Sequence, residues 1–204
     1  MENLKKTIII TVSLFLALSI QSQTTWQQAF YKSYEAENSG KYALAISELT
    51  KIYKADDYFI NIRLGWLNYL SKQHTESQKH YQLAINLKPY SIEARFGMVK
   101  PLSATENWEK VKQQYHAILK IDPQNTTANY WLGVIYYNRK DYTNAQKLFE
   151  KVVNLYPLDY DSLIMLGWTK LNMGKHAEAK ILFNHALTIR PGDQSATSGL
   201  KLIK

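Results

Sequence analysis

Apolar side chains follow a helical period along most of this chain. They recur at spacings of three and four residues on segments of roughly 13 residues, with polar residues between them. An α-helix turns once every 3.6 residues, so this spacing gathers the apolar side chains on one face. Two such segments fit into each stretch of 34 residues. The pattern therefore predicts successive pairs of amphipathic helices.

The helix pairs follow a strict repeat. Prolines recur every 34 residues, at Pro89, Pro123, Pro157 and Pro191. Glycines lie 24 residues before three of these prolines, at Gly65, Gly133 and Gly167. The chain contains only five prolines, so a fixed period of this length indicates one structural unit repeated in tandem.

The residues within one period resemble the tetratricopeptide repeat. The period that ends at Pro157 reads, in order, Leu132, Gly133, Tyr136, Tyr142, Ala145, Phe149 and Pro157. The family pattern is a Leu-Gly pair, a Tyr, an Ala and a Phe four residues apart, and a final Pro. The resemblance extends over residues 26–191, although the Trp that often opens the family pattern is absent from the matching positions.

The resemblance implies an all-α fold, a right-handed superhelical array of antiparallel helix pairs of the tetratricopeptide solenoid type. We expect a repeat domain over residues 23–204 with about five repeats, at residues 26–57, 58–91, 92–125, 126–159 and 160–193. A capping helix at residues 194–204 would shield the open end of the array. The residues expected to cap the helix that follows each proline are Ser91, Asn125, Asp159 and Asp193.

The repeat at residues 92–125 departs from the others. Gly97 and Val111 are 14 residues apart, whereas the corresponding Gly133 and Ala145 are 12 apart, which predicts two inserted residues. Pro101 lies in the same stretch and has no amide hydrogen for the helical ladder, so it is expected to end the first helix early. The segment is interpreted either as a kink that shapes a binding surface or as a tolerated turn insertion.

The first 22 residues have the order of a secretory signal peptide. Lys5 and Lys6 precede an uncharged apolar run at residues 7–20, and small or polar residues follow. A membrane-spanning helix needs ~20 apolar residues, which is more than this run provides, although a short uncleaved anchor is the alternative. We expect cleavage after Ser22 or Ser19 and an exported protein that is periplasmic, envelope-associated or secreted.

The net charge and the absence of cysteine limit the classes of partner that we expect this protein to bind. The chain has 25 Lys and Arg residues against 17 Asp and Glu, a formal net charge of +8, and no Cys. An exported protein without cysteine folds without disulfides, so packed apolar surface must stabilise it. For such a protein we expect no nucleic acid partner and no stable membrane insertion after signal removal.

The sequence offers no catalytic or metal-binding constellation. Its five histidines are not spaced as metal ligands, and it has no glycine-rich phosphate loop. We therefore expect no enzymatic activity, no metal and no cofactor.

Aromatic and amide side chains form a second stripe on the first helix of each repeat. In proteins of this family the first helices line a concave groove, so the resemblance places the stripe there. The expected ligand-binding residues are Tyr34, Trp66, Tyr69, Tyr130, Tyr137, Asn138, Trp168 and Asn172. Family members that clamp a terminal carboxylate carry Lys, Arg and Asn at these positions, so the resemblance argues against such a clamp.

These features predict an exported scaffold or adaptor that binds a segment of a partner protein in an aromatic concave groove. Aromatic side chains bury a large area at low entropic cost and are typical of interface hot spots. Two alternatives stay open: the groove binds envelope polysaccharide or another glycan, or the aromatic side chains pack between neighbouring helices. Self-association through the first repeat, residues 26–57, is a further option.

Overall fold

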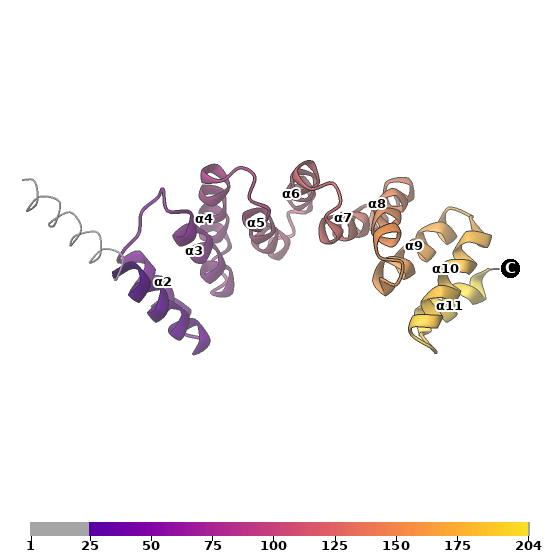
Figure 1. Ribbon diagram of the computed structural model, residues 1–204, viewed down its shortest axis with the longest axis horizontal. Coiled ribbons are helices and arrows are strands. Elements are labelled where there is room, and N and C mark those ends of the chain that lie inside the picture. Colours follow the sequence, from indigo (N-terminus) through magenta and orange to yellow (C-terminus); the bar gives the residue numbers. More distant parts are fainter. Residues whose placement is uncertain (1–24, 204) are drawn as a thin grey trace, which may run out of the picture. The chain divides into compact units, whose positions relative to one another are not determined.

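The computed structural model describes residues 25–203, in which every regular element is a helix (Figure 1). Residues 25–38 form the N-terminal helix. The helices after it are α2 (Tyr42–Thr50), α3 (Tyr58–Leu70), α4 (His74–Leu87), α5 (Ile92–Ala104), α6 (Trp108–Ile121), α7 (Thr126–Asn138), α8 (Tyr142–Leu155), α9 (Tyr160–Asn172), α10 (His176–Ile189) and α11 (Gln194–Leu202). The predicted all-α fold of paired helices is confirmed, while the predicted signal peptide lies outside the described residues.

The described residues form two compact units, and the chain passes from the first to the second between Thr105 and Glu106. Unit 1 contains the N-terminal helix and α2 to α5, and unit 2 contains α6 to α11. Within a unit, helices pack against their neighbours in sequence, and first helices of consecutive repeats also meet, as α3 meets α5 and α9 meets α11. Among residues 25–203, no helix combines the length and hydrophobicity needed to cross a bilayer.

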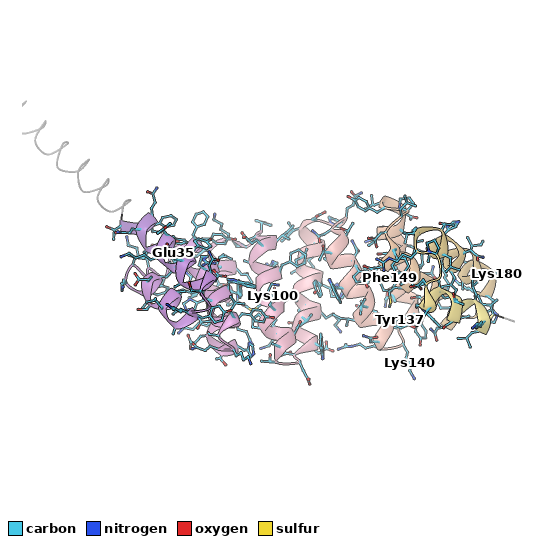
Figure 2. The ribbon with its side chains drawn as sticks, turned by 90° about the horizontal axis from the view of Figure 1, so that it is seen from below. Glu35, Lys100, Tyr137, Lys140, Phe149 and Lys180 are labelled. Atoms are coloured by element: carbon cyan, nitrogen blue, oxygen red, sulfur yellow. The ribbon has the colours of Figure 1, made fainter. Side chains whose placement is uncertain are left out.

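In unit 2, helix pairs close where an aromatic ring of the second helix lies against a glycine of the first. Phe149 of α8 lies on Gly133 of α7, and Phe183 of α10 lies on Gly167 of α9, with both rings fully buried. Figure 2 shows Phe149 among the helices of unit 2. A Cβ atom at either glycine would come within 2.8 Å of the ring. The absence of a side chain therefore sets how closely the two helices approach.

The same contact joins consecutive repeats in unit 1. Tyr81 of α4 lies between Gly65 of α3 and Gly97 of α5 and is 3% exposed. A Cβ atom at Gly65 would lie 3.0 Å from the ring, and one at Gly97 would overlap it. Tyr81 thus holds the first helices of two repeats beside each other.

The predicted helix caps are confirmed. Each capping side chain accepts a hydrogen bond from the backbone amide three residues later: Ser91 from Ala94, Asn125 from Ala128, Asp159 from Ser162 and Asp193 from Ala196. Such a cap stabilises a helix by ~1 kcal/mol because it satisfies a free amide of the first turn. The last of these caps starts α11, so the predicted C-terminal helix is present.

The predicted two-residue insertion in the repeat at residues 92–125 is wrong. α5 has 13 residues, as α3, α7 and α9 have, and a three-residue turn joins it to α6 as in the other pairs. In α3, α7 and α9 the eighth residue of the helix is glycine, and in α5 this position holds Val99. We call the glycine at this place the eighth-position glycine. Gly97 is the sixth residue of its helix, like Gly199 of α11, and each of these lies against the aromatic ring of the preceding repeat. This repeat, in which Val99 stands where Gly65, Gly133 and Gly167 stand in theirs, is also the one in which the chain divides into two units.

The prediction that Pro101 ends α5 early is also wrong. The helix continues through Pro101 to Ala104, and both Pro101 and Leu102 are buried. Proline removes one backbone hydrogen bond, and the apolar packing of the last turn outweighs that loss. The Thr105 hydroxyl donates a hydrogen bond to the Pro101 carbonyl at 2.9 Å, which satisfies one of the acceptors at the helix end.

The glycine contact can be tested with Gly133→Ala. The added methyl group would meet the Phe149 ring, so we expect the free energy of unfolding to fall by about 1–3 kcal/mol, as in other overpacked cores. Urea denaturation followed by circular dichroism measures this change. In a Gly133→Ala/Phe149→Leu double variant, the smaller side chain leaves room for the methyl group. Strictly additive losses in the double variant would contradict a steric limit set by the ring.

Candidate functional site

Unit 1 contains a groove between the N-terminal helix, α3 and α5, with a volume of about 560 Å³. We call it the unit 1 groove. Its lining residues are Phe30, Tyr34, Tyr58, Phe59, Ile62, Arg63, Trp66, Tyr81, Glu93, Phe96, Gly97 and Lys100. Except for Tyr81, all of them lie on the first helices of three consecutive repeats. The volume is typical of ligand sites in proteins.

Helical spacing brings the aromatic side chains of the groove onto shared faces. Phe59, Ile62 and Trp66 are three and four residues apart on α3, and Phe30 and Tyr34 are four apart on the N-terminal helix. Phe59 is 57% exposed and Tyr34 is 47% exposed. Large apolar side chains gathered on an exposed surface often mark a binding site.

A carboxylate on the N-terminal helix fixes the orientation of Trp66. The indole Nε1 of Trp66 donates a hydrogen bond to Oε1 of Glu37 at 2.6 Å, and Nη2 of Arg63 donates to Oε2 at 2.6 Å. The Arg63 guanidinium also lies over the Tyr34 ring, 3.8 Å from its centre. The Arg63 and Glu37 side chains are largely shielded from water. Glu37 therefore links two repeats and holds two groove side chains in place.

A second depression, of about 570 Å³, adjoins the groove, and we call it the flanking hollow. Its lining residues are Tyr58, Phe59, Lys88, Pro89, Tyr90, Ser91 and Glu93, of which Tyr58, Phe59 and Glu93 also line the groove. The Tyr58 hydroxyl lies 2.6 Å from Oγ of Ser91 and donates to Glu93 at 3.3 Å. Burial is the main cause of the raised pKa of Tyr58; Ser91 opposes the shift and Glu93 adds to it.

Two of the predicted site residues, Tyr34 and Trp66, line the unit 1 groove. Tyr69 packs against Trp66, with ring centres 5.7 Å apart, and lies outside the lining. Tyr58 and Phe59 are not among the predicted site residues, although they lie eight and seven residues before Trp66 on the same helix. Following the helical stripe one turn further toward the N-terminus would have found them.

In unit 2, the predicted site residue Trp168 contacts the C-terminal helix. Its Nε1 donates a hydrogen bond to Oγ of Ser195 on α11 at 2.8 Å, and its ring packs edge-on to Phe183 at 5.3 Å. The eighth-position glycine precedes Trp168 as it precedes Trp66. The two tryptophans occupy the same place in their repeats, but Trp66 bonds to the repeat before it and Trp168 to the helix after it.

The other predicted residues of unit 2 contact one another or the core. Tyr130 packs edge-on to Phe149 at 5.9 Å. Nδ2 of Asn172 donates to the Tyr137 hydroxyl at 3.2 Å, and Asn138 is exposed. The bond between Asn172 and Tyr137 joins adjacent repeats of unit 2, whereas the contact of Tyr130 with Phe149 lies within one repeat. In the part of the chain that the structure describes, no three His, Asp or Glu side chains are arranged to hold a metal ion.

Comparison with known proteins finds a family match over part of the chain. The tetratricopeptide repeat family model matches residues 124–191. The RNA polymerase-associated protein CTR9 of Caenorhabditis elegans is 29% identical over 114 residues, which cover 55% of this chain and 10% of that protein. The chain thus spans about a tenth of the length of that relative.

Solved structures show the same fold. A tetratricopeptide repeat protein from Parabacteroides merdae superposes with a TM-score of 0.75 at 18% identity, over 88% of this chain and 72% of that one. MamA gives 0.70 at 17% identity, over 81% and 91% of the two chains. YrrB, described as a tetratricopeptide repeat protein with an unusual peptide-binding site, gives 0.71 at 13% identity, over 91% and 97%. Residues 124–191 thus match the tetratricopeptide repeat family, and the described residues have the fold of tetratricopeptide repeat proteins.

Replacement of Glu37 by alanine tests the anchoring of the groove. The change leaves the Arg63 guanidinium and the Trp66 indole without their shared acceptor, so we expect a loss of about 2–3 kcal/mol of unfolding free energy. The shift of the urea midpoint measures it. The control is Glu35→Ala, which removes an exposed carboxylate two residues away that bonds to Tyr31. Equal effects of the two substitutions would contradict a special role for Glu37.

Proposed function

We propose that this chain is an exported, non-enzymatic scaffold that binds a segment of a partner protein in the unit 1 groove. The observation that carries the proposal is the set of aromatic side chains that three consecutive first helices present to a single open groove. Aromatic side chains with few rotatable bonds are favoured anchors at protein interfaces. The repeat fold is consistent with a protein-interaction scaffold.

The shape of the site favours an extended segment as the ligand. The groove and the flanking hollow share Tyr58, Phe59 and Glu93, so a bound chain can pass from one to the other. Trp66 is fixed by its bond to Glu37 and needs no further ordering when a ligand binds. The similarity to YrrB, which is described as having a peptide-binding site, supports a peptide ligand by fold analogy.

The ring faces favour a peptide over a glycan. A sugar stacks on an aromatic ring through the free face of that ring, whereas the guanidinium of Arg63 already covers one face of Tyr34 at 3.8 Å. The ammonium of Lys100 lies over Trp66 at 5.4 Å. Peptide side chains can instead enter the groove between the rings and contact their edges.

The ionisation of the groove residues fits a binding role. Burial raises the pKa of Tyr58 and Tyr81 above the ordinary tyrosine value. Both hydroxyls therefore stay protonated at neutral pH and are poor nucleophiles.

Export is supported by the sequence of residues 1–22, in which two lysines precede an apolar run.

Panning of a random dodecapeptide display library against residues 23–204 tests the binding role. We expect enriched sequences whose affinity falls at least about 30-fold in the Trp66→Ala variant, since a central aromatic anchor contributes ~2 kcal/mol or more. Titration calorimetry measures the dissociation constants, and circular dichroism checks that helicity is retained. The control variant is Trp131→Ala, which removes a half-exposed tryptophan of unit 2. The proposal fails if no peptide is enriched, or if both variants lose affinity alike.

Export is tested by the mass and location of the chain in its source cell. We expect the full-length gene product to be recovered outside the cytosol, shortened by 19 or 22 residues, because a small residue occupies each of these positions. A Leu16→Arg variant should remain uncleaved, because a charge interrupts the apolar run. An unshortened cytosolic product from the native sequence would refute export and leave the binding role unaffected.

A further inference from the structure

Three cationic side chains of unit 1 lie over aromatic rings of the groove or the hollow. The distances from the charged centre to the ring centre are 3.8 Å for Arg63 over Tyr34, 4.3 Å for Lys88 over Tyr58 and 5.4 Å for Lys100 over Trp66. Each cation is attracted to the electron-rich face of its ring. The walls of the site therefore combine aromatic area with positive charge.

The three cations differ in their carboxylate partners. Arg63 forms an ion pair with Glu37, so its charge is balanced within the protein. Within the described part of the chain, neither Lys88 nor Lys100 has a carboxylate at ion-pair distance. One further carboxylate, Glu93, lines both the groove and the hollow. The site thus keeps two ammonium groups that can pair with a ligand, and the balance of its charges is positive.

The two unpaired ammonium groups serve different parts of the site. Lys100 lies on α5 and lines the groove, whereas Lys88 precedes α5, at the end of α4, and lines the hollow. Lys88 lies over the Tyr58 ring and Lys100 over the Trp66 ring, and these two residues are eight positions apart on α3. Because a helix rises 1.5 Å per residue, the two ammonium groups are separated by about 12 Å along α3. A single carboxylate, such as a chain terminus, therefore cannot pair with both lysines.

This separation sets the spacing of a matching ligand. An extended chain advances about 3.3 Å per residue, so four residues cover about 13 Å, which matches this separation. Alternate side chains of an extended chain point the same way, so the first, third and fifth residues of such a segment would all face the site. The middle residue would lie near Ile62, which lies on α3 between Tyr58 and Trp66 and lines the groove.

From these observations we propose that the partner presents an internal, extended segment with two acidic side chains four residues apart and an apolar side chain midway between them. The acidic side chains pair with Lys88 and Lys100, and the apolar side chain packs at Ile62 between the Phe59 and Trp66 rings. This inference rests on the proposed binding function and adds the chemistry of the partner. A basic segment would meet like charge at both ends of the site, which disfavours its binding.

The test uses a fluorescein-labelled nonapeptide, amidated at its C-terminus, with glutamate at positions three and seven, leucine at five and serine elsewhere. Binding to residues 23–204 is followed by fluorescence anisotropy at 50 mM salt. We expect the dissociation constant to rise about three- to fivefold in Lys88→Gln and in Lys100→Gln, and further in the double variant. The same peptide with glutamine in place of glutamate should bind more weakly and respond little to these substitutions.

Two matched variants make the assignment specific. Lys54→Gln removes one exposed lysine of unit 1 that lines neither depression, and it should leave binding unchanged. The charge-reversed Lys88→Glu/Lys100→Glu variant should prefer a peptide with lysine at positions three and seven. That reversal cannot arise from lost folding, because it is a gain of binding.

Several results would overturn the inference. Equal binding of the glutamate and glutamine peptides, with both lost in Trp66→Ala, would reject the acidic partner and keep the groove as a peptide site. Equal loss in Lys54→Gln would indicate general attraction to surface charge. Binding that needs only a free C-terminal carboxylate would also reject the internal acidic segment. The same holds if an anionic oligosaccharide binds and the peptide does not. Failure of all the peptides would reject this spacing, while the library panning decides the binding role separately.

Discussion

The structure depends on the contact between one aromatic ring and the backbone of a helix that carries glycine. Phe149 and Phe183 lie on such glycines in unit 2, and Tyr81 lies between two of them in unit 1. Each ring fills the space between two helices. Because glycine has no side chain, the backbone of the helix can come into direct contact with the ring. Because one ring can touch the first helices of two repeats, the contact that closes a pair also positions the next repeat.

Stacking of this kind leaves the opposite faces of the first helices available for other uses. Trp66 and Trp168 stand at the same position of their repeats, yet their indole groups bond to Glu37 and Ser195 respectively. In unit 1 this leaves an open groove lined by aromatic side chains, whereas in unit 2 the tryptophan packs on Phe183 and the C-terminal helix. Neighbouring residues, rather than the repeat itself, decide which tryptophan faces a depression.

Charge gives the unit 1 groove a chemical character that its rings alone lack. Arg63, Lys88 and Lys100 each lie over a ring, and Glu37 balances the first of them. A site built in this way joins apolar contact area with electrostatic selection of the ligand.

The sequence by itself determined the repeat, the helix pairs and their caps. Proline spacing, helical periodicity and residues such as Asn125 and Asp193 act locally, and local signals can be read along the chain. The prediction that Gly97 corresponds to Gly133 was wrong. The sequence alone does not show which aromatic ring a glycine contacts, and that contact depends on how the helices pack. Only the tertiary structure brought Glu37 to Trp66 and placed Lys100 over the same ring, because these contacts join different repeats and depend on how the helices stack.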